Sequence, residues 1–96
     1  MVKESNKIEI KAIKLRYTEL NDGLTEKEVE ILLEVEGRII SLFVPLNKVD
    51  LDNGTVLLME VERSGNSVII ELPGEPLNTG RRLEVNGSWL EGAVVA

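Results

Sequence analysis

The 96-residue chain contains no cysteine and no histidine. It therefore lacks the residues for disulfides, thiolate nucleophiles, imidazole bases and the common zinc sites. A Ser–His–Asp or Cys–His catalytic group is excluded for the same reason, and no serine lies in a G-x-S-x-G turn. These absences remove most of the chemistry that small enzymes use. We predict that the protein is not an enzyme and has no catalytic residue, cofactor or metal site.

Aromatic residues and long apolar runs are also scarce. Tyr17, Phe43 and Trp89 are the only aromatics, so the core must be built from 14 Leu, 8 Ile and 11 Val residues. No segment approaches the roughly 18 apolar residues of a membrane span, and residues 1–7 are too polar for a signal peptide. With 43% apolar and 29% charged residues, the composition is typical of a folded, soluble chain. We expect one cytoplasmic, β-rich domain over residues 1–96.

Apolar and polar residues alternate along most of the chain, which predicts β-strands. Val29, Ile31, Leu33 and Val35 are separated mainly by glutamates, and turn residues recur about every ten positions. The pattern predicts an all-β sandwich or small barrel of about seven antiparallel strands. The expected hairpins join 28–36 with 38–46, 55–63 with 67–72, and 81–85 with 88–95. Segment 38–46 has apolar residues on both faces, and we expect both to be covered.

Residues 25–36 allow a second interpretation. Thr25 and Glu28 have the spacing of a helix capping box, and Gly37 is placed to end a helix. The alternative is therefore an α+β fold with one helix at about 25–36. A helix would place Glu28 and Glu36 within the apolar arc, whereas a strand turns every glutamate away from it. The pattern favours the strand.

Two local irregularities carry predictions of their own. The first strand, residues 7–20, changes apolar parity once, which predicts a bulge near Ala12–Ile13. Asn86-Gly87 has the chemistry of a two-residue type I′ turn and predicts the last hairpin.

Residues 50–54 have the alternating carboxylates of a calcium loop, but the later ligand positions do not match. We interpret them as a turn with local side-chain caps.

Charge is distributed unevenly. The chain has a net charge of −6, yet residues 1–16 carry +3 and residues 17–37 carry −6. In one interpretation the basic and acidic segments lie side by side and form cross-strand Lys–Glu pairs. In the other, one or both face a partner. Glutamate also outnumbers aspartate fourteen to three, a bias of heat-adapted proteins, although the seven asparagines argue against it.

The end of the chain suggests self-association. Residues 88–96 are apolar almost to the last position, and Glu91 is their only charge. As a strand, this segment either closes the sheet against the first strand or pairs with a second copy in a homodimer. We therefore predict a non-catalytic interaction or assembly module. The candidate interaction residues are Lys7, Lys11, Lys14, Arg16, Tyr17, Trp89, Leu90 and Val94.

The alternative function is nucleic-acid binding by a small β-barrel. Its candidate residues are the cations and aromatic residue that such a surface needs: Lys7, Lys11, Lys14, Arg16, Arg81, Arg82 and Tyr17. A sequence pI near 4.7 and the shortage of aromatics argue against this function.

Overall fold

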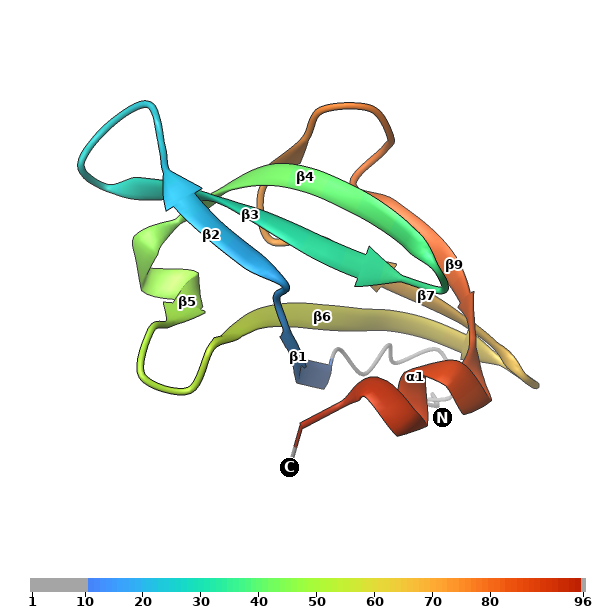
Figure 1. Cartoon of the computed structure of the whole chain (residues 1–96). Coiled ribbons are helices and arrows are strands. Elements are labelled where there is room, and N and C mark those ends of the chain that lie inside the picture. The colour runs from blue at the N-terminus through green and yellow to red at the C-terminus, as the bar shows by residue number, and fades with distance from the viewer. Residues whose placement is uncertain (1–10, 96) are drawn as a thin grey trace, which may run out of the picture.

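The computed structural model describes residues 11–95, which form two antiparallel sheets and one short helix (Figure 1). Its elements are β1 (Lys11–Arg16), β2 (Glu19–Asp22), β3 (Glu28–Val35), β4 (Arg38–Pro45), the 3-10 turn η2 (Leu46–Lys48), β5 (Val49–Asp50), β6 (Thr55–Ser64), β7 (Ser67–Glu71), β8 (Glu75–Pro76), β9 (Arg82–Asn86) and α1 (Gly87–Ala93). Sheet A has the order β1-β6-β7-β9, with β5 also paired to β6, and sheet B has the order β2-β3-β4-β8. The predicted all-β fold is confirmed.

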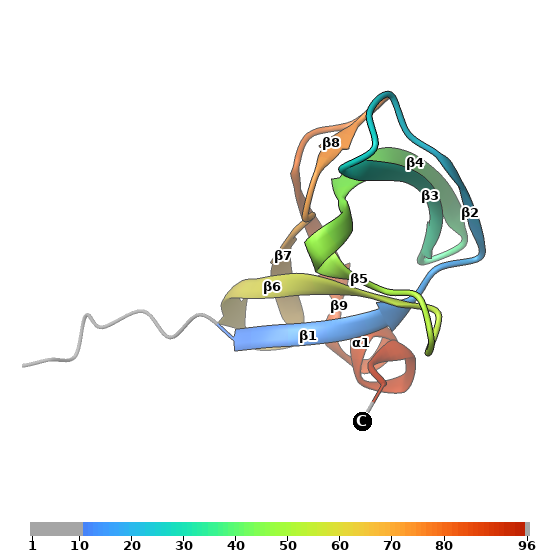
Figure 2. The same cartoon turned by 90° about the vertical axis from the view of Figure 1, so that its left-hand side faces the viewer.

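The core lies between the two sheets and is aliphatic (Figure 2). On β3, Ile31, Leu33 and Val35 point inward and are fully buried. Sheet A contributes an equivalent set of buried side chains: Ile13, Leu15, Val56, Leu58, Val68, Ile70, Leu83 and Val85. Strands β1, β3, β4, β7 and β9 therefore bury alternate residues, as the two-residue period predicts.

Residues 28–35 form a strand, so the helical alternative for this region is wrong. The strand pairs with β4 through the turn Glu36-Gly37, in which both residues have positive φ, 53° and 84°. This is the backbone of a type I′ hairpin. The residues with capping-box spacing serve the β2–β3 loop instead. The Thr25 hydroxyl accepts the Lys27 amide (3.2 Å), and the Glu28 carboxylate accepts the Leu24 amide (3.1 Å).

The predicted first strand begins outside the described residues, and its described part, 11–20, is divided between the two sheets. β1 pairs with β6 without interruption from Lys11 to Arg16, so the bulge predicted near Ala12–Ile13 is wrong; a register shift lies instead in β6, between Glu60 and Glu62. The chain crosses to sheet B after Tyr17, and the Thr18 amide donates to the Leu32 carbonyl (2.8 Å). This crossing joins the two sheets along one side of the core.

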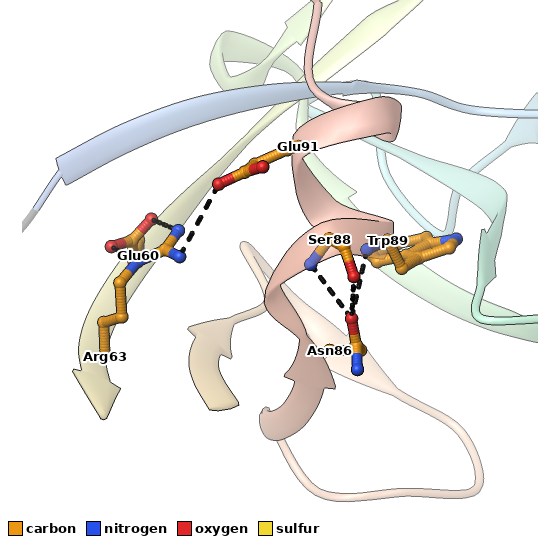
Figure 3. Close-up of polar contacts among 6 residues, drawn as sticks. All are labelled: Glu60, Arg63, Asn86, Ser88, Trp89 and Glu91. Atoms are coloured by element: carbon orange, nitrogen blue, oxygen red, sulfur yellow. Dashed lines mark hydrogen bonds and ion pairs between the residues drawn. The ribbon is translucent and has the colours of Figure 1, made fainter. Parts of the chain in front are cut away.

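The predicted hairpin of 81–85 with 88–95 is also wrong, because Asn86 begins a helix. Asn86 has extended backbone angles (φ −76°, ψ 132°), whereas a type I′ turn needs positive φ. Its side-chain oxygen accepts the amides of Ser88 (2.9 Å) and Trp89 (3.4 Å), as an N-cap does (Figure 3). Arg63 on β6 lies between Glu60 (3.2 Å) and Glu91 of the helix (4.0 Å).

The helix closes the fold against β1. Leu90 is 1% exposed in the core, Val94 bridges to Leu15, and the Val95 amide donates to the Lys14 carbonyl (2.9 Å). The end of the chain thus covers the edge of β1, one of the two arrangements expected for it. It does so as a helix followed by a single bridge and not as a strand.

Replacing Asn86 with alanine should lower the free energy of unfolding by about 1 kcal/mol, because two helix amides lose their acceptor. In a domain of this size the expected fall in Tm is about 4–8 °C, measured by circular dichroism. Asn86→Ser keeps a capping oxygen and should remain close to the original protein. An alanine variant as stable as the serine variant would contradict this role of Asn86.

Candidate functional site

The described parts of the two charged segments lie in different sheets. Lys11, Lys14 and Arg16 belong to β1, which pairs with β6, while the glutamates of β3 lie between β2 and β4. The expected side-by-side Lys–Glu pairing of these segments is therefore wrong. Among residues 11–95, the ion pairs join only residues of β6 and later elements: Arg63–Glu60, Arg63–Glu91, Arg81–Glu75 and Arg82–Glu71.

The outer face of sheet B combines apolar side chains with glutamates. The register places Glu30 beside Phe43, Leu32 beside Ser41, and Glu34 beside Ile39. Leu77 continues the β8 pairing next to Ser41, because its amide donates to the Ser41 carbonyl (3.0 Å). We call this region the acidic–apolar surface; its members are Glu19, Glu30, Leu32, Glu34, Ile39, Phe43 and Leu77.

The apolar part of this surface is open to solvent. Ile39 is 55% exposed and Leu77 is 61% exposed, while Leu32 and Phe43 are half-buried. The expectation that both faces of 38–46 are covered is therefore wrong for the outer face. Helix α1 lies near β1 and β9, away from this face (Figures 1 and 2). The sequence shows apolar residues at the outward positions of this segment, but their alternation does not show that this face is open to solvent.

The carboxylates of the surface accept hydrogen bonds from neutral side chains, and few cations lie near them. The Ser41 hydroxyl donates to Glu30 (2.6 Å) and the Asn21 amide group donates to Glu19 (3.2 Å). The outward positions of β2, β3 and β4 hold no lysine or arginine. At the β8 edge, Arg81 lies 4.0 Å from Glu75 and balances that charge. The described face therefore has an apolar centre bordered by glutamates.

The residues predicted as interaction candidates separate into two groups. Lys11, Lys14 and Arg16 are exposed along β1, whereas Lys7 lies outside the described residues. The apolar and aromatic candidates contribute to the core instead: Tyr17, Trp89 and Val94 pack against it half-buried, and Leu90 is buried within it. The interaction role of these four residues stays a prediction, with Leu90 the least accessible of them at 1% exposure.

The wider nucleic-acid set is not gathered on one surface either. Arg82 begins β9 of sheet A and pairs with Glu71, whereas Arg81 precedes β9 and lies 4.0 Å from Glu75 of β8 in sheet B. The strand order places β9 at the opposite end of the sheet from β1. Their cations are therefore separated from those of β1 by two strands.

The loop after β5 is a turn, as predicted. The Asp50 carboxylate accepts the side-chain amide (2.8 Å) and the backbone amide (3.2 Å) of Asn53. These hydrogen bonds from Asn53 lower the pKa of Asp50, because they favour the charged form. The Gly54 amide bonds to the Asp50 carbonyl (2.9 Å) and closes the turn. The carboxylate thus acts as a local cap.

Within residues 11–95, no helix is long and apolar enough to cross a membrane. Comparisons of the whole chain with protein-family models, with curated proteins and with solved structures gave no match.

Proposed function

We propose that the protein is a non-catalytic interaction module that binds a protein partner through the acidic–apolar surface. The observation that carries the proposal is the exposure of Ile39 and Leu77 on a sheet face whose charged neighbours are glutamates. Single exposed apolar residues are common, but a contiguous group bordered by charges of one sign is typical of a contact site.

The two kinds of side chain contribute differently to binding. Burying an exposed Leu or Ile stabilises a complex by about 1.5–3 kcal/mol when the burial is complete, so Ile39 and Leu77 supply affinity. Charges at the border, such as Glu34, mainly accelerate encounter and fix orientation. The complementary partner surface therefore has an apolar centre surrounded by lysine or arginine.

A fluorescein-labelled peptide of alternating leucine and lysine, followed by fluorescence anisotropy, tests the apolar contribution. Leu77→Ser should weaken binding about tenfold, because roughly 1.4 kcal/mol of apolar burial is lost. Leu51→Ser is the matched control, since Leu51 is similarly exposed (56%) but lies in the β5–β6 loop. Equal affinities of the two variants would contradict the assignment of the site.

A second pair of variants tests the contribution of charge to peptide binding. Glu34→Lys and Glu62→Lys change the net charge by the same amount, but Glu34 lies on sheet B and Glu62 on sheet A. Only Glu34→Lys should reduce peptide affinity, and the difference should shrink at high salt. If both variants lose affinity equally, the peptide is attracted by net charge alone and the proposed surface is wrong.

A further inference from the structure

We infer that the partner is a second copy of this chain, whose basic outer face on sheet A docks on the acidic–apolar surface. This inference rests on the function proposed above and identifies the surface that meets it. Its basis is a second group of apolar and charged side chains, of the opposite sign, on the other sheet.

The outer face around β1 carries the required cations. Lys14 and Arg16 are exposed on β1, and the register places Lys14 beside the half-buried Leu57 and Ala12 beside Met59. Lys48 of η2 lines the same hollow as Lys14 and Leu57. We call this region the basic–apolar surface; its members are Ala12, Lys14, Arg16, Lys48, Leu57 and Met59.

Two negative groups near this surface, Asp50 and Glu71, are already engaged. Asp50 lines the hollow but accepts two hydrogen bonds from Asn53. Glu71, beside Met59, pairs with Arg82 (2.9 Å). Lys14 and Lys48 line the hollow against the single carboxylate of Asp50, and Arg16, on the same strand as Lys14, adds a third cation to the surface. The two surfaces therefore both have an apolar centre, but the charges around it are positive on this surface and negative on the acidic–apolar surface.

The position of the two surfaces determines how copies would join. They are the outer faces of sheets that lie on opposite sides of the core (Figure 2), so they cannot meet within one molecule. Each copy offers one surface of each kind, which makes the contact heterologous and the assembly a ring or an open row. Pairing through an edge strand at 88–95, as expected from the sequence, has no counterpart here because that segment is mainly α1.

The net charge of −6 opposes association at long range but does not decide it. At physiological salt the screening length is about 8 Å, so repulsion between distant charges is weak while contacting charges still attract. We therefore expect concentration-dependent association of the intact chain at this ionic strength.

Sedimentation analysis of two complementary variants tests the arrangement. Glu34→Lys with Leu77→Ser blocks the acidic–apolar surface, and Lys14→Glu with Arg16→Glu blocks the basic–apolar surface. Each variant alone should be at least about tenfold weaker in self-association than the intact chain. Because each retains the surface that the other lacks, an equimolar mixture should form a 1:1 dimer and nothing larger.

Glu62→Lys adds a cation to the outer face of sheet A and leaves the members of both surfaces unchanged, so this variant should associate at least as strongly as the intact chain. Thermal unfolding checks that every variant is folded. Self-association of either blocked variant, or a mixture that stays monomeric while the intact chain associates, would overturn the inference. So would a monomeric intact chain at about 100 μM, well above a micromolar Kd. In that case, retained binding of the leucine–lysine peptide would leave the proposed function standing, and its loss would remove both.

Discussion

Replacing Gly74 with alanine is expected to destabilise the chain by about 3 kcal/mol or more, the upper range for inserting an atom into a packed site. A Cβ at Gly74 would lie 1.8 Å from the Phe43 carbonyl oxygen and 2.8 Å from its carbon, where ordinary contacts begin at 3.4 Å. Both atoms belong to the backbone of β4, so no side-chain rotation relieves the overlap. The segment that enters β8 must move away from β4.

The consequences of this movement extend to the binding surface. β8 pairs with β4 only through Glu75 and Pro76, and the Leu77 amide adds a single bond to Ser41. Displacing the segment would break this pairing and shift Leu77 away from Phe43. The alanine variant should therefore also bind the leucine–lysine peptide less tightly.

Gly80→Ala is the control, because Gly80 lies on the other side of β8, in the β8–β9 connection, and has nothing within 4 Å of the added atom. At such a compatible site alanine should be neutral or stabilise by up to about 1 kcal/mol. Thermal unfolding should show a fall in Tm of more than about 12 °C for Gly74→Ala, at 4–8 °C per kcal/mol, and none for Gly80→Ala. Equal Tm values for the two variants would show that the segment entering β8 can move away from β4 without loss of stability. The close approach of Gly74 to Phe43 would then contribute nothing to stability.

The strands could be predicted from sequence because burial on one face imposes a period of two. In β3, the glutamates share one parity and the buried residues Ile31, Leu33 and Val35 share the other. A helix would have mixed these sets, so the alternation predicts the correct structure despite the capping-box spacing of Thr25 and Glu28. Periodicity over eight residues outweighed a local terminal signal.

The last segment could have been predicted as a helix from the same kind of argument. Trp89, Leu90, Ala93 and Val94 are the residues that pack inward, with the spacing of one helix face. A strand would have grouped Ser88, Leu90 and Gly92 instead. Asn86-Gly87 led to the wrong prediction of a hairpin because asparagine is common both in type I′ turns and at helix N-caps. The spacing of the apolar residues that follow distinguishes the two structures.

The acidic–apolar surface could not be located from the sequence, because it depends on which strands are neighbours. Ile39 and Phe43 share a parity that suggests a second buried face, and only the absence of a covering element in residues 11–95 shows them open. Leu77 joins them through a two-residue strand, too short for a periodic pattern. Likewise, the separation of the β1 cations from the β3 glutamates follows from the crossing at Tyr17–Thr18, which no local signal specifies.

Leu90→Ala is expected to cost about 2–5 kcal/mol, because it empties a site that is 1% exposed in the core. That is a large part of the 5–15 kcal/mol that usually stabilises a domain, so partial unfolding near body temperature is expected. The first region to open should be the contact of the chain end with β1, where hydrogen exchange of the Val95 amide, bonded to the Lys14 carbonyl, gives a direct measurement. Leu51→Ala removes the same atoms from an exposed loop and should change stability by less than about 0.5 kcal/mol. If Leu90→Ala unfolds no more easily than Leu51→Ala, the helix does not seal β1, and the packing that orients the basic–apolar surface must come from β6 alone.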